Sequence, residues 1–214
     1  MLRNVQTYEI FTVLIIIGIV FIAVTKSMYP RRFNDFVYVL GNSKYLKIYA
    51  RDQKFFDKFD AFLFVNLIIS LSIFVFICLQ NLTVIEVPTM DVMFKLAFAI
   101  ASLILIKVLI ERLIGSLFEM DTLIDQYLFQ KISYKNFLGV WLVPINLLLL
   151  FSFKPNSTII YVVVFLLLII NIVGTITTIK THLSLIKQNL FYFILYLCAL
   201  EIAPYILLYK VFIS

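Results

Sequence analysis

The stretch AFLFVNLIISLSIFVFICLQ, residues 61–80, decides the fold class of this protein. It contains no charged side chain, and a helix of its length crosses the ~30 Å hydrocarbon core of a bilayer. The whole chain has a similar character, since 63% of its 214 residues are hydrophobic and 14% are charged. A soluble domain of this length needs more polar surface than this composition supplies. The sequence therefore predicts a multi-pass membrane protein.

Five other apolar stretches have a similar length. The six predicted spans cover approximately 9–25, 61–80, 93–115, 137–153, 158–179 and 190–212. The first could be taken for a signal peptide, but IAVTKS at its end is not a small-x-small cleavage site, so we interpret it as a retained anchor. We expect a single all-α domain over 1–214, a bundle of six transmembrane helices.

Lys and Arg are distributed unequally between the two sides of these spans. Fourteen of the eighteen fall in segment 26–60, around the connection after the third span, or after the fifth span. The positive-inside rule places such loops in the cytoplasm, so both chain termini are predicted to face away from it. Because topology and headgroup contact account for the basic charge, we expect no nucleic-acid partner.

Two segments on the predicted cytoplasmic side look amphipathic. Segment 26–60 carries aromatic residues at helical spacing among basic ones, and segment 116–136 carries an apolar stripe opposite acidic and amide side chains. Such helices lie in the membrane interface. We expect headgroup or partner contacts from these residues: Arg31, Arg32, Lys44, Lys47, Arg51, Lys54 and Lys58. The alternatives are packing against the protein's own helices, and binding of a lipid-linked phosphate by Arg31, Arg32, Lys44 and Lys47.

Glu201 lies about halfway along the last predicted span, where an unpartnered charge costs about 2.5–3.5 kcal/mol. Counted from the cytoplasmic ends, Glu201 is about 11 residues deep and Lys107 about 8, a difference of roughly 4–5 Å. Other polar residues fall at similar depths, and Glu111 stands one turn from Lys107. The sequence thus predicts an intramembrane polar cluster of Lys107, Glu111, Asn146, Asn171 and Glu201.

Pro144 and Pro204 are predicted helix kinks near this cluster. Each proline frees the carbonyl four residues earlier, which in a bilayer needs another donor. The cluster itself has two interpretations. It is a buried pair that fixes helix packing, or part of a proton-coupled transporter in which Glu201 titrates beside Lys107. The two halves of the chain show no inverted repeat, which disfavours the transporter.

Chemistry-bearing residues are few. No span has the paired acids or histidine of a membrane protease, and His182 is the one histidine. We therefore predict no catalytic residue, no metal-ligand set and no cofactor, and hence a protein that is not an enzyme. Cys78 and Cys198 both lie in apolar runs at different predicted depths, so we interpret them as packing residues and not as a disulfide.

Four motifs occur in a characteristic order: YPRRFNDF (29–36), KYLKIYARDQKFFDKFDAFLFVN (44–66), YKNFLGVWLVP (134–144) and LCALEIAP (197–204). Over nearly the whole chain they resemble an uncharacterised membrane-protein family of Bacteroidota, domain of unknown function 4271. The resemblance implies the inner membrane of a bacterium with two membranes, and implies no activity. In such a membrane the orientation predicted from Lys and Arg puts both termini in the periplasm. Members of that family are often encoded near a polyprenol-phosphate sugar transferase.

Together these features predict a non-enzymatic inner-membrane subunit that anchors or scaffolds an envelope-biogenesis complex, such as a membrane adaptor for such a transferase or for export machinery. Segment 26–60 would present the docking surface. The expected partners are anionic lipid headgroups on the cytoplasmic side and a protein partner or a second copy of the chain. The alternative is a small proton-coupled transporter or a lipid-phosphate binder that uses the intramembrane cluster.

Overall fold

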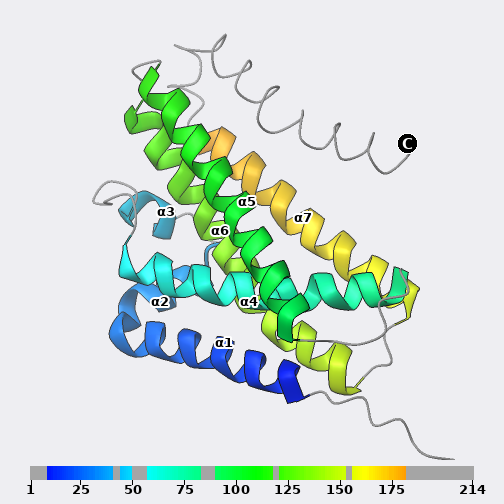
Figure 1. The fold of residues 1–214 in the computed structure, drawn as a ribbon. Coiled ribbons are helices and arrows are strands. Elements are labelled where there is room, and N and C mark those ends of the chain that lie inside the picture. Colours follow the sequence, from blue (N-terminus) through cyan, green and yellow to red (C-terminus); the bar gives the residue numbers. More distant parts are fainter. Residues whose placement is uncertain are drawn as a thin grey trace, which may run out of the picture.

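The computed structural model describes residues 9–40, 44–49, 57–82, 90–117, 121–152 and 156–181. Within these ranges every regular element is helical, so the predicted all-α class is confirmed for them (Figure 1). The elements are α1 (Glu9–Met28), α2 (Pro30–Val37), α3 (Lys44–Tyr49), α4 (Lys58–Leu82), α5 (Met90–Leu117), α6 (Asp121–Leu147), a π-helical segment (Leu148–Ser152) and α7 (Ser157–Thr181).

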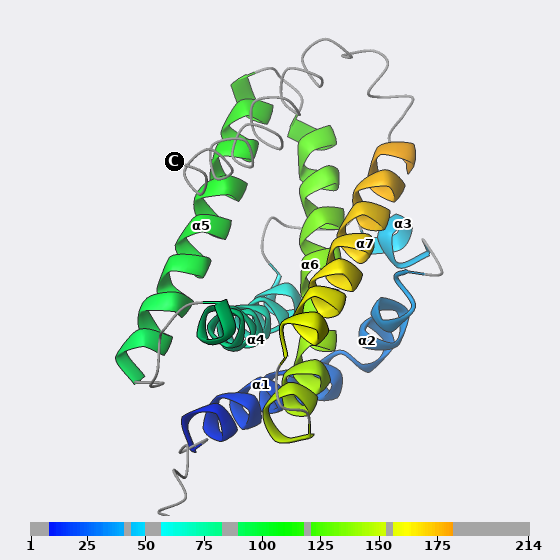
Figure 2. The ribbon, with the colours of Figure 1, turned by 90° about the vertical axis from the view of Figure 1, so that its right-hand side faces the viewer.

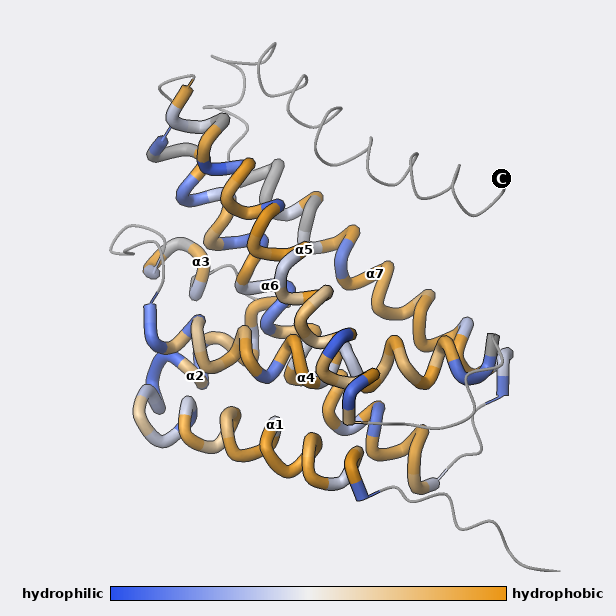
Figure 3. The backbone as a smooth tube through the Cα atoms, viewed as in Figure 1, coloured by the Kyte–Doolittle hydropathy of each residue, from blue (hydrophilic) through white to orange (hydrophobic). Residues whose placement is uncertain are grey.

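Five of these helices are long and apolar enough to cross a membrane. They are α1, α4, α5, α6 with its π-helical extension, and α7. Each contains one of the first five predicted spans, except that residue 153 of the fourth span lies outside the described residues. Hydrophobic residues fill their central stretches, while hydrophilic residues gather toward the ends (Figure 3). The described helices are thus those of a multi-pass membrane protein. The sixth predicted span, 190–212, lies outside the described residues.

Helix α4 is the centre of the bundle. It contacts α1, α5, α6 and α7. Helices α1 and α4 lie side by side, and α5, α6 and α7 cross them obliquely (Figures 1 and 2). In the most apolar 18-residue stretch of α4, 56% of the residues are buried in the protein. The corresponding fraction is 11% in α5 and in α7. Helices α5 and α7 therefore expose mostly apolar side chains to the outside of the bundle, as lipid-facing helices do.

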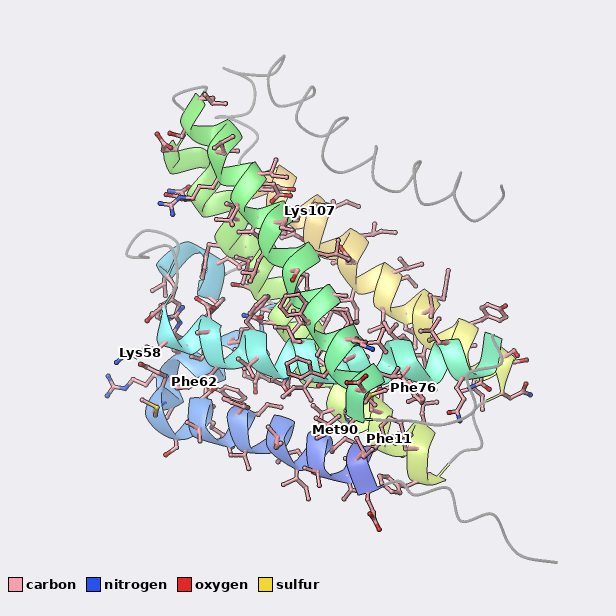
Figure 4. The ribbon with its side chains drawn as sticks, viewed as in Figure 1. Phe11, Lys58, Phe62, Phe76, Met90 and Lys107 are labelled. Atoms are coloured by element: carbon pink, nitrogen blue, oxygen red, sulfur yellow. The ribbon has the colours of Figure 1, made fainter. Side chains whose placement is uncertain are left out.

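One end of the bundle collects the short helices, and we call it the α2–α3 end. Helix α1 ends there, α4 begins, α5 ends, α6 begins and α7 ends (Figure 1). At the other end, Phe11 of α1 packs against Phe76 of α4, with ring centroids 5.4 Å apart (Figure 4). The positive-inside prediction, which rests on the basic residues of segment 26–60, would place the α2–α3 end on the cytoplasmic side.

The predicted interfacial segment 116–136 is not a separate helix in its described part. Helix α6 runs without a break from Asp121 to Leu147, so residues 121–136 form the first half of the helix that also holds the fourth predicted span. No proline occurs in α6 before Pro144, so nothing ends the helix earlier. Two of its polar residues pair with α5, Lys131 with Glu111 and Asp125 with Arg112.

Helices α4 and α6 approach closely at Gly139. A Cβ atom at this position would lie 2.7 Å from the Cα of Leu67, a backbone atom that only a movement of α4 can displace. We expect Gly139→Ala to destabilise the protein by about 1–3 kcal/mol, because overpacking forces the two central helices apart. The measurement is the melting temperature of the protein in detergent.

Gly18→Ala is the matched control for this prediction. A Cβ atom at Gly18 meets only a side-chain atom, Oδ1 of Asn66, at 3.0 Å. Because a side chain moves at lower cost than a helix backbone, the melting temperature should fall less at Gly18 than at Gly139. An equal or larger fall at Gly18 would show that the Gly139 contact does not hold α4 and α6 in register.

Candidate functional site

The α2–α3 end is organised around Arg32, the third residue of α2. Its Nη1 donates a hydrogen bond to the Asp57 carboxylate, and its Nη2 donates to Oδ2 of Asp60 at 3.0 Å. The guanidinium also lies over the ring of Phe59, 4.4 Å from its centroid, and over that of Tyr49, at 5.2 Å. One side chain thus connects α2 with α3 and with the start of α4.

The local sequence explains why α2 takes this position. Pro30 occupies the first turn of α2, where the N–H that it lacks has no intrahelical partner to lose. The backbone N–H of Tyr29 donates to the carbonyl of Thr25 at 3.0 Å, and that of Phe33 donates to the carbonyl of Tyr29 at 2.9 Å. The chain therefore turns from α1 into α2 within one residue, and Arg32 is held close to the bundle.

Aromatic packing fixes α2 and α3 onto the longer helices. Phe36, Tyr45 and Phe59 are fully buried. The ring of Phe36 lies 5.7 Å from those of Tyr45 and Phe59 and 6.0 Å from that of Phe137 in α6, all edge-on. Edge-to-face pairs add to the burial energy of the rings. Of the interpretations given for segment 26–60, the structure therefore supports packing against the protein's own helices for these aromatic residues.

The electrostatics of this end reflect its burial. Burial raises the pKa of Tyr45, and the nearby Asp60 carboxylate raises it further, so its hydroxyl stays neutral. Burial also raises the pKa of Tyr49, whose hydroxyl donates to the Asp35 carboxylate at 3.4 Å. Asp60, with its side chain 5% exposed, is the carboxylate here that most depends on a cation, and Arg32 supplies it.

The predicted docking residues separate into three groups. Arg31 and Lys58 are exposed, and Lys58 points away from the bundle (Figure 4). Lys44 and Lys47 lie in or at the start of α3, but their side chains are outside the described set, as are the residues Arg51 and Lys54. Arg32 does not fit the prediction: its side chain is 11% exposed and bound to two carboxylates, so it is an internal residue.

A second polar site joins α5 and α6. Nζ of Lys131 lies 2.6 Å from Oε1 of Glu111, with Glu111 fully buried and the Lys131 side chain 14% exposed. Val108 and Leu128, each one turn from a member of this pair, are buried with Ile124 in one apolar cluster of α5 and α6. Within the described residues, Oε2 of Glu111 has no hydrogen-bond partner. The site is a short ion pair in apolar surroundings, where removing either charge leaves the other uncompensated.

The predicted intramembrane cluster is not assembled as one layer. Glu111 pairs with Lys131, whereas Nδ2 of the buried Asn146 donates to the carbonyl of Ser70 in α4 at 2.8 Å. Lys131 and Asn146 are fifteen positions apart on α6, about 22 Å along a helix. The prediction placed Asn146 at the depth of Lys107 by counting from residue 137, whereas the helix that holds Asn146 begins at Asp121.

Asn171 borders a cavity of about 220 Å³ between α4, α5, α6 and α7, together with Ile104 and Lys135. Lys107 stands one turn from Ile104 in α5, and their spacing of three residues puts them on the same face of the helix. The structure thus brings Asn171 and Lys135 to one cavity, with Lys107 beside its α5 wall. Glu201, the remaining member of the predicted cluster, lies outside the described residues.

The two predicted kinks have different outcomes. Pro144 lies inside α6, which continues for three residues and then widens into the π-helical segment Leu148–Ser152. Such widening is a known local adjustment of a helix ladder. Pro204 lies outside the described residues.

Three residues of the two polar sites were not identified from the sequence: Asp57, Asp60 and Lys131. A signal for Asp60 exists, because an acid at the start of a long apolar span needs a cation, and the arginine pair 31–32 lies at the end of the preceding span. Lys131 was used only for topology, although Glu111 required a partner. Among the described residues, no group of three His, Cys, Asp or Glu side chains could hold a metal ion.

Comparison with known proteins places the chain in one family. No curated protein and no solved structure matches this sequence. A family model, described as domain of unknown function (DUF4271), matches residues 11–212, nearly the whole chain. That match includes both polar sites and the segment that follows α7. The protein therefore belongs to the family of domain of unknown function DUF4271.

Proposed function

We propose that this protein is a non-enzymatic membrane subunit that anchors a partner protein of an envelope-biogenesis complex at the α2–α3 end. The observation that carries the proposal is the internal role of Arg32, which holds α2 and α3 on the bundle through Asp57 and Asp60. A short segment held this way is a preorganised surface, and preorganisation lowers the entropic cost of binding.

The outward side chains of this segment have the composition of an interface. Arg31 and Lys58 are exposed, and exposed apolar side chains accompany them, with Tyr38 69% exposed and Ile48 46% exposed. Aromatic residues and arginine are enriched in protein interfaces, where they supply much of the binding energy. We call these four residues the docking surface. Its basic charge favours an acidic partner and, at the membrane, anionic headgroups.

We expect the double substitution Arg31→Glu/Lys58→Glu to abolish stoichiometric recovery of the partner, because it reverses the charge of the docking surface. The protein would be purified from native membranes in a mild detergent, and the co-purifying proteins quantified by mass spectrometry. The melting temperature should remain that of the wild type, since both side chains are exposed.

Lys95→Glu is the matched control for this experiment. Lys95 is 76% exposed, but it lies in the first turns of α5, away from the α2–α3 end. A partner lost from the double variant and retained by Lys95→Glu supports the docking surface. Equal recovery from all three proteins, with anionic lipid retained, would contradict an anchoring role and favour lipid binding.

The Glu111–Lys131 pair favours a second candidate, a proton-coupled transporter. A fully buried carboxylate with one oxygen unpaired among the described residues is an arrangement that proton-carrying membrane proteins use. Under this candidate, Glu111→Gln would leave a folded protein that no longer carries protons across proteoliposome membranes. Under the anchoring proposal, neither the wild type nor the Glu111→Gln variant carries protons, and the substitution changes only the stability of the protein.

A further inference from the structure

A groove opens on the side of the bundle between α5 and α7. These two helices stand on either side of α4 and α6, which form the floor of the groove (Figure 2). Leu67 of α4 and Leu142 of α6 are 3% and 1% exposed, whereas Leu168 on the α7 rim is 53% exposed. The cavity of about 220 Å³ is therefore closed toward the core and open toward the surroundings of the bundle, which for spanning helices are lipid.

The groove is elongated. Its lining residues fall within 67–74 of α4, 135–142 of α6 and 164–171 of α7, besides Ile104 of α5. Each of these three ranges advances by seven positions, which is about 10 Å along a helix. Sites for compact, drug-sized ligands have volumes of about 300–1,000 Å³, and this cavity is smaller. It can therefore hold one flexible chain, but not a bulky group.

The groove is apolar except at one end. Lys135 and Asn171 are polar, and the other described lining residues are hydrophobic. On their helices these two residues lie nearest the α2–α3 end, because α6 begins there and α7 ends there. The ammonium group of Lys135 has three N–H donors and the Asn171 amide has two, so each can bind a ligand oxygen in addition to contacts within the protein. The polar end of the groove thus combines hydrogen-bond donors with positive charge.

This polar end is directed toward the nearer membrane surface. Cα–Cβ bonds tilt toward the N-terminus of their helix, and α6 begins at the α2–α3 end, so the Lys135 side chain leaves α6 in that direction. A lysine with its stem on apolar surface extends its ammonium group toward the headgroups. Lys107, one turn from Ile104, adds a second cation beside the α5 wall. An anionic group that approaches from this surface is therefore attracted to the groove.

We propose that the groove binds an anionic phospholipid from the leaflet on the α2–α3 side, with one acyl chain along the apolar lining and the phosphate at Lys135 and Asn171. The chain replaces the apolar contacts that the open side lacks, and charged N–H donors form strong hydrogen bonds with phosphate oxygens. Basic pockets between membrane helices bind anionic headgroups in the same way. A zwitterionic lipid has the same phosphate, but its own ammonium group competes with Lys135 for it.

Native mass spectrometry of the whole purified chain tests this preference for charge. The delipidated protein would be offered phosphatidylglycerol and phosphatidylcholine with identical acyl chains. We expect one phosphatidylglycerol to bind at a several-fold lower lipid concentration than phosphatidylcholine. Lys135→Met should remove the preference, and Lys135→Arg should keep it.

Lys26→Met is the matched control for charge. Lys26 is an exposed cation in the last turn of α1, at the same end of the bundle but outside the groove lining. Its loss should leave the preference for phosphatidylglycerol unchanged. Equal binding of the two lipids by the wild type would overturn the proposal, as would an equal loss of preference in Lys26→Met and Lys135→Met.

Val164→Trp tests the apolar part of the groove without a change of charge. Val164 belongs to the lining, so an indole at this position takes the space of the acyl chain. Val162→Trp is its control, because Val162 is 54% exposed and lies two residues away, about 200° around α7. We expect several-fold weaker binding of phosphatidylglycerol by Val164→Trp and unchanged binding by Val162→Trp.

Two results of this second experiment would overturn the proposal. One is equal binding of phosphatidylglycerol by the two tryptophan variants. The other is a wild-type dimer that binds no lipid and that Val164→Trp converts to a monomer, since a second copy of the chain would then be the occupant. The inference does not depend on the docking surface, so either proposal can fail while the other holds.

Discussion

Arg32→Met is expected to lower the free energy of unfolding by about 3–5 kcal/mol, the cost of breaking a buried ion pair. The substitution keeps much of the aliphatic length and removes the cation that serves Asp57 and Asp60. Asp60 is the critical partner, because its side chain is 5% exposed and cannot recover full hydration. The measurement is unfolding by SDS in mixed micelles, with the free energy of unfolding extrapolated to zero SDS.

Arg31→Met is the control, because it removes an exposed positive charge from α2, whereas Arg32→Met removes a largely buried one. Arg31 has the same chemistry one position away, but it is exposed, so the change should stay within about 0.5 kcal/mol. Asp60→Asn added to Arg32→Met should recover part of the loss, because no buried charge then remains unpaired. If Arg31→Met and Arg32→Met proved equally costly, the charge of the segment as a whole would be responsible, and Arg32 would not organise the α2–α3 end.

Lys131→Met should be as damaging, by about 3–5 kcal/mol, because it leaves the fully buried Glu111 carboxylate without its cation. The pair itself is expected to contribute little net stability, since burying both ions also costs desolvation. Adding Glu111→Leu to Lys131→Met should therefore restore stability to near or above that of the wild type. The same SDS unfolding experiment measures both variants.

The neighbouring ion pair between α5 and α6 provides the comparison. Arg112 and Asp125 are 3.6 Å apart, and both side chains are 44% exposed. Half-exposed pairs are screened by water, so Arg112→Met should cost no more than about 1 kcal/mol. If Lys131→Met and Arg112→Met lowered the free energy of unfolding equally, burial would not determine how much stability is lost when an ion pair is broken. A double variant as unstable as Lys131→Met alone would mean that lost packing, and not the unpaired Glu111, causes the damage.

The two arginines of α2 show the limit of interpretation from sequence. Arg31 and Arg32 have the same charge and adjacent positions in the chain, and both were predicted to contact headgroups or a partner. The rotation of α2 turns Phe33 and Phe36 into the core and leaves Arg31 exposed, and Arg32 reaches Asp60. Only the position of α4 in the structure shows which arginine is internal, because its partner Asp60 lies 28 positions away along the chain.

The sequence alone determined the helical class and the five described spans. Long apolar stretches such as 61–80 can satisfy their backbone hydrogen bonds within the bilayer only as helices. It also indicated that Glu111 needs a cation, because an unpaired charge in hydrocarbon is costly. The tertiary structure decided which cation this is. Depth along a helix fixes one coordinate of a side chain, whereas rotation and neighbour order depend on packing, and these pair Glu111 with Lys131 of α6.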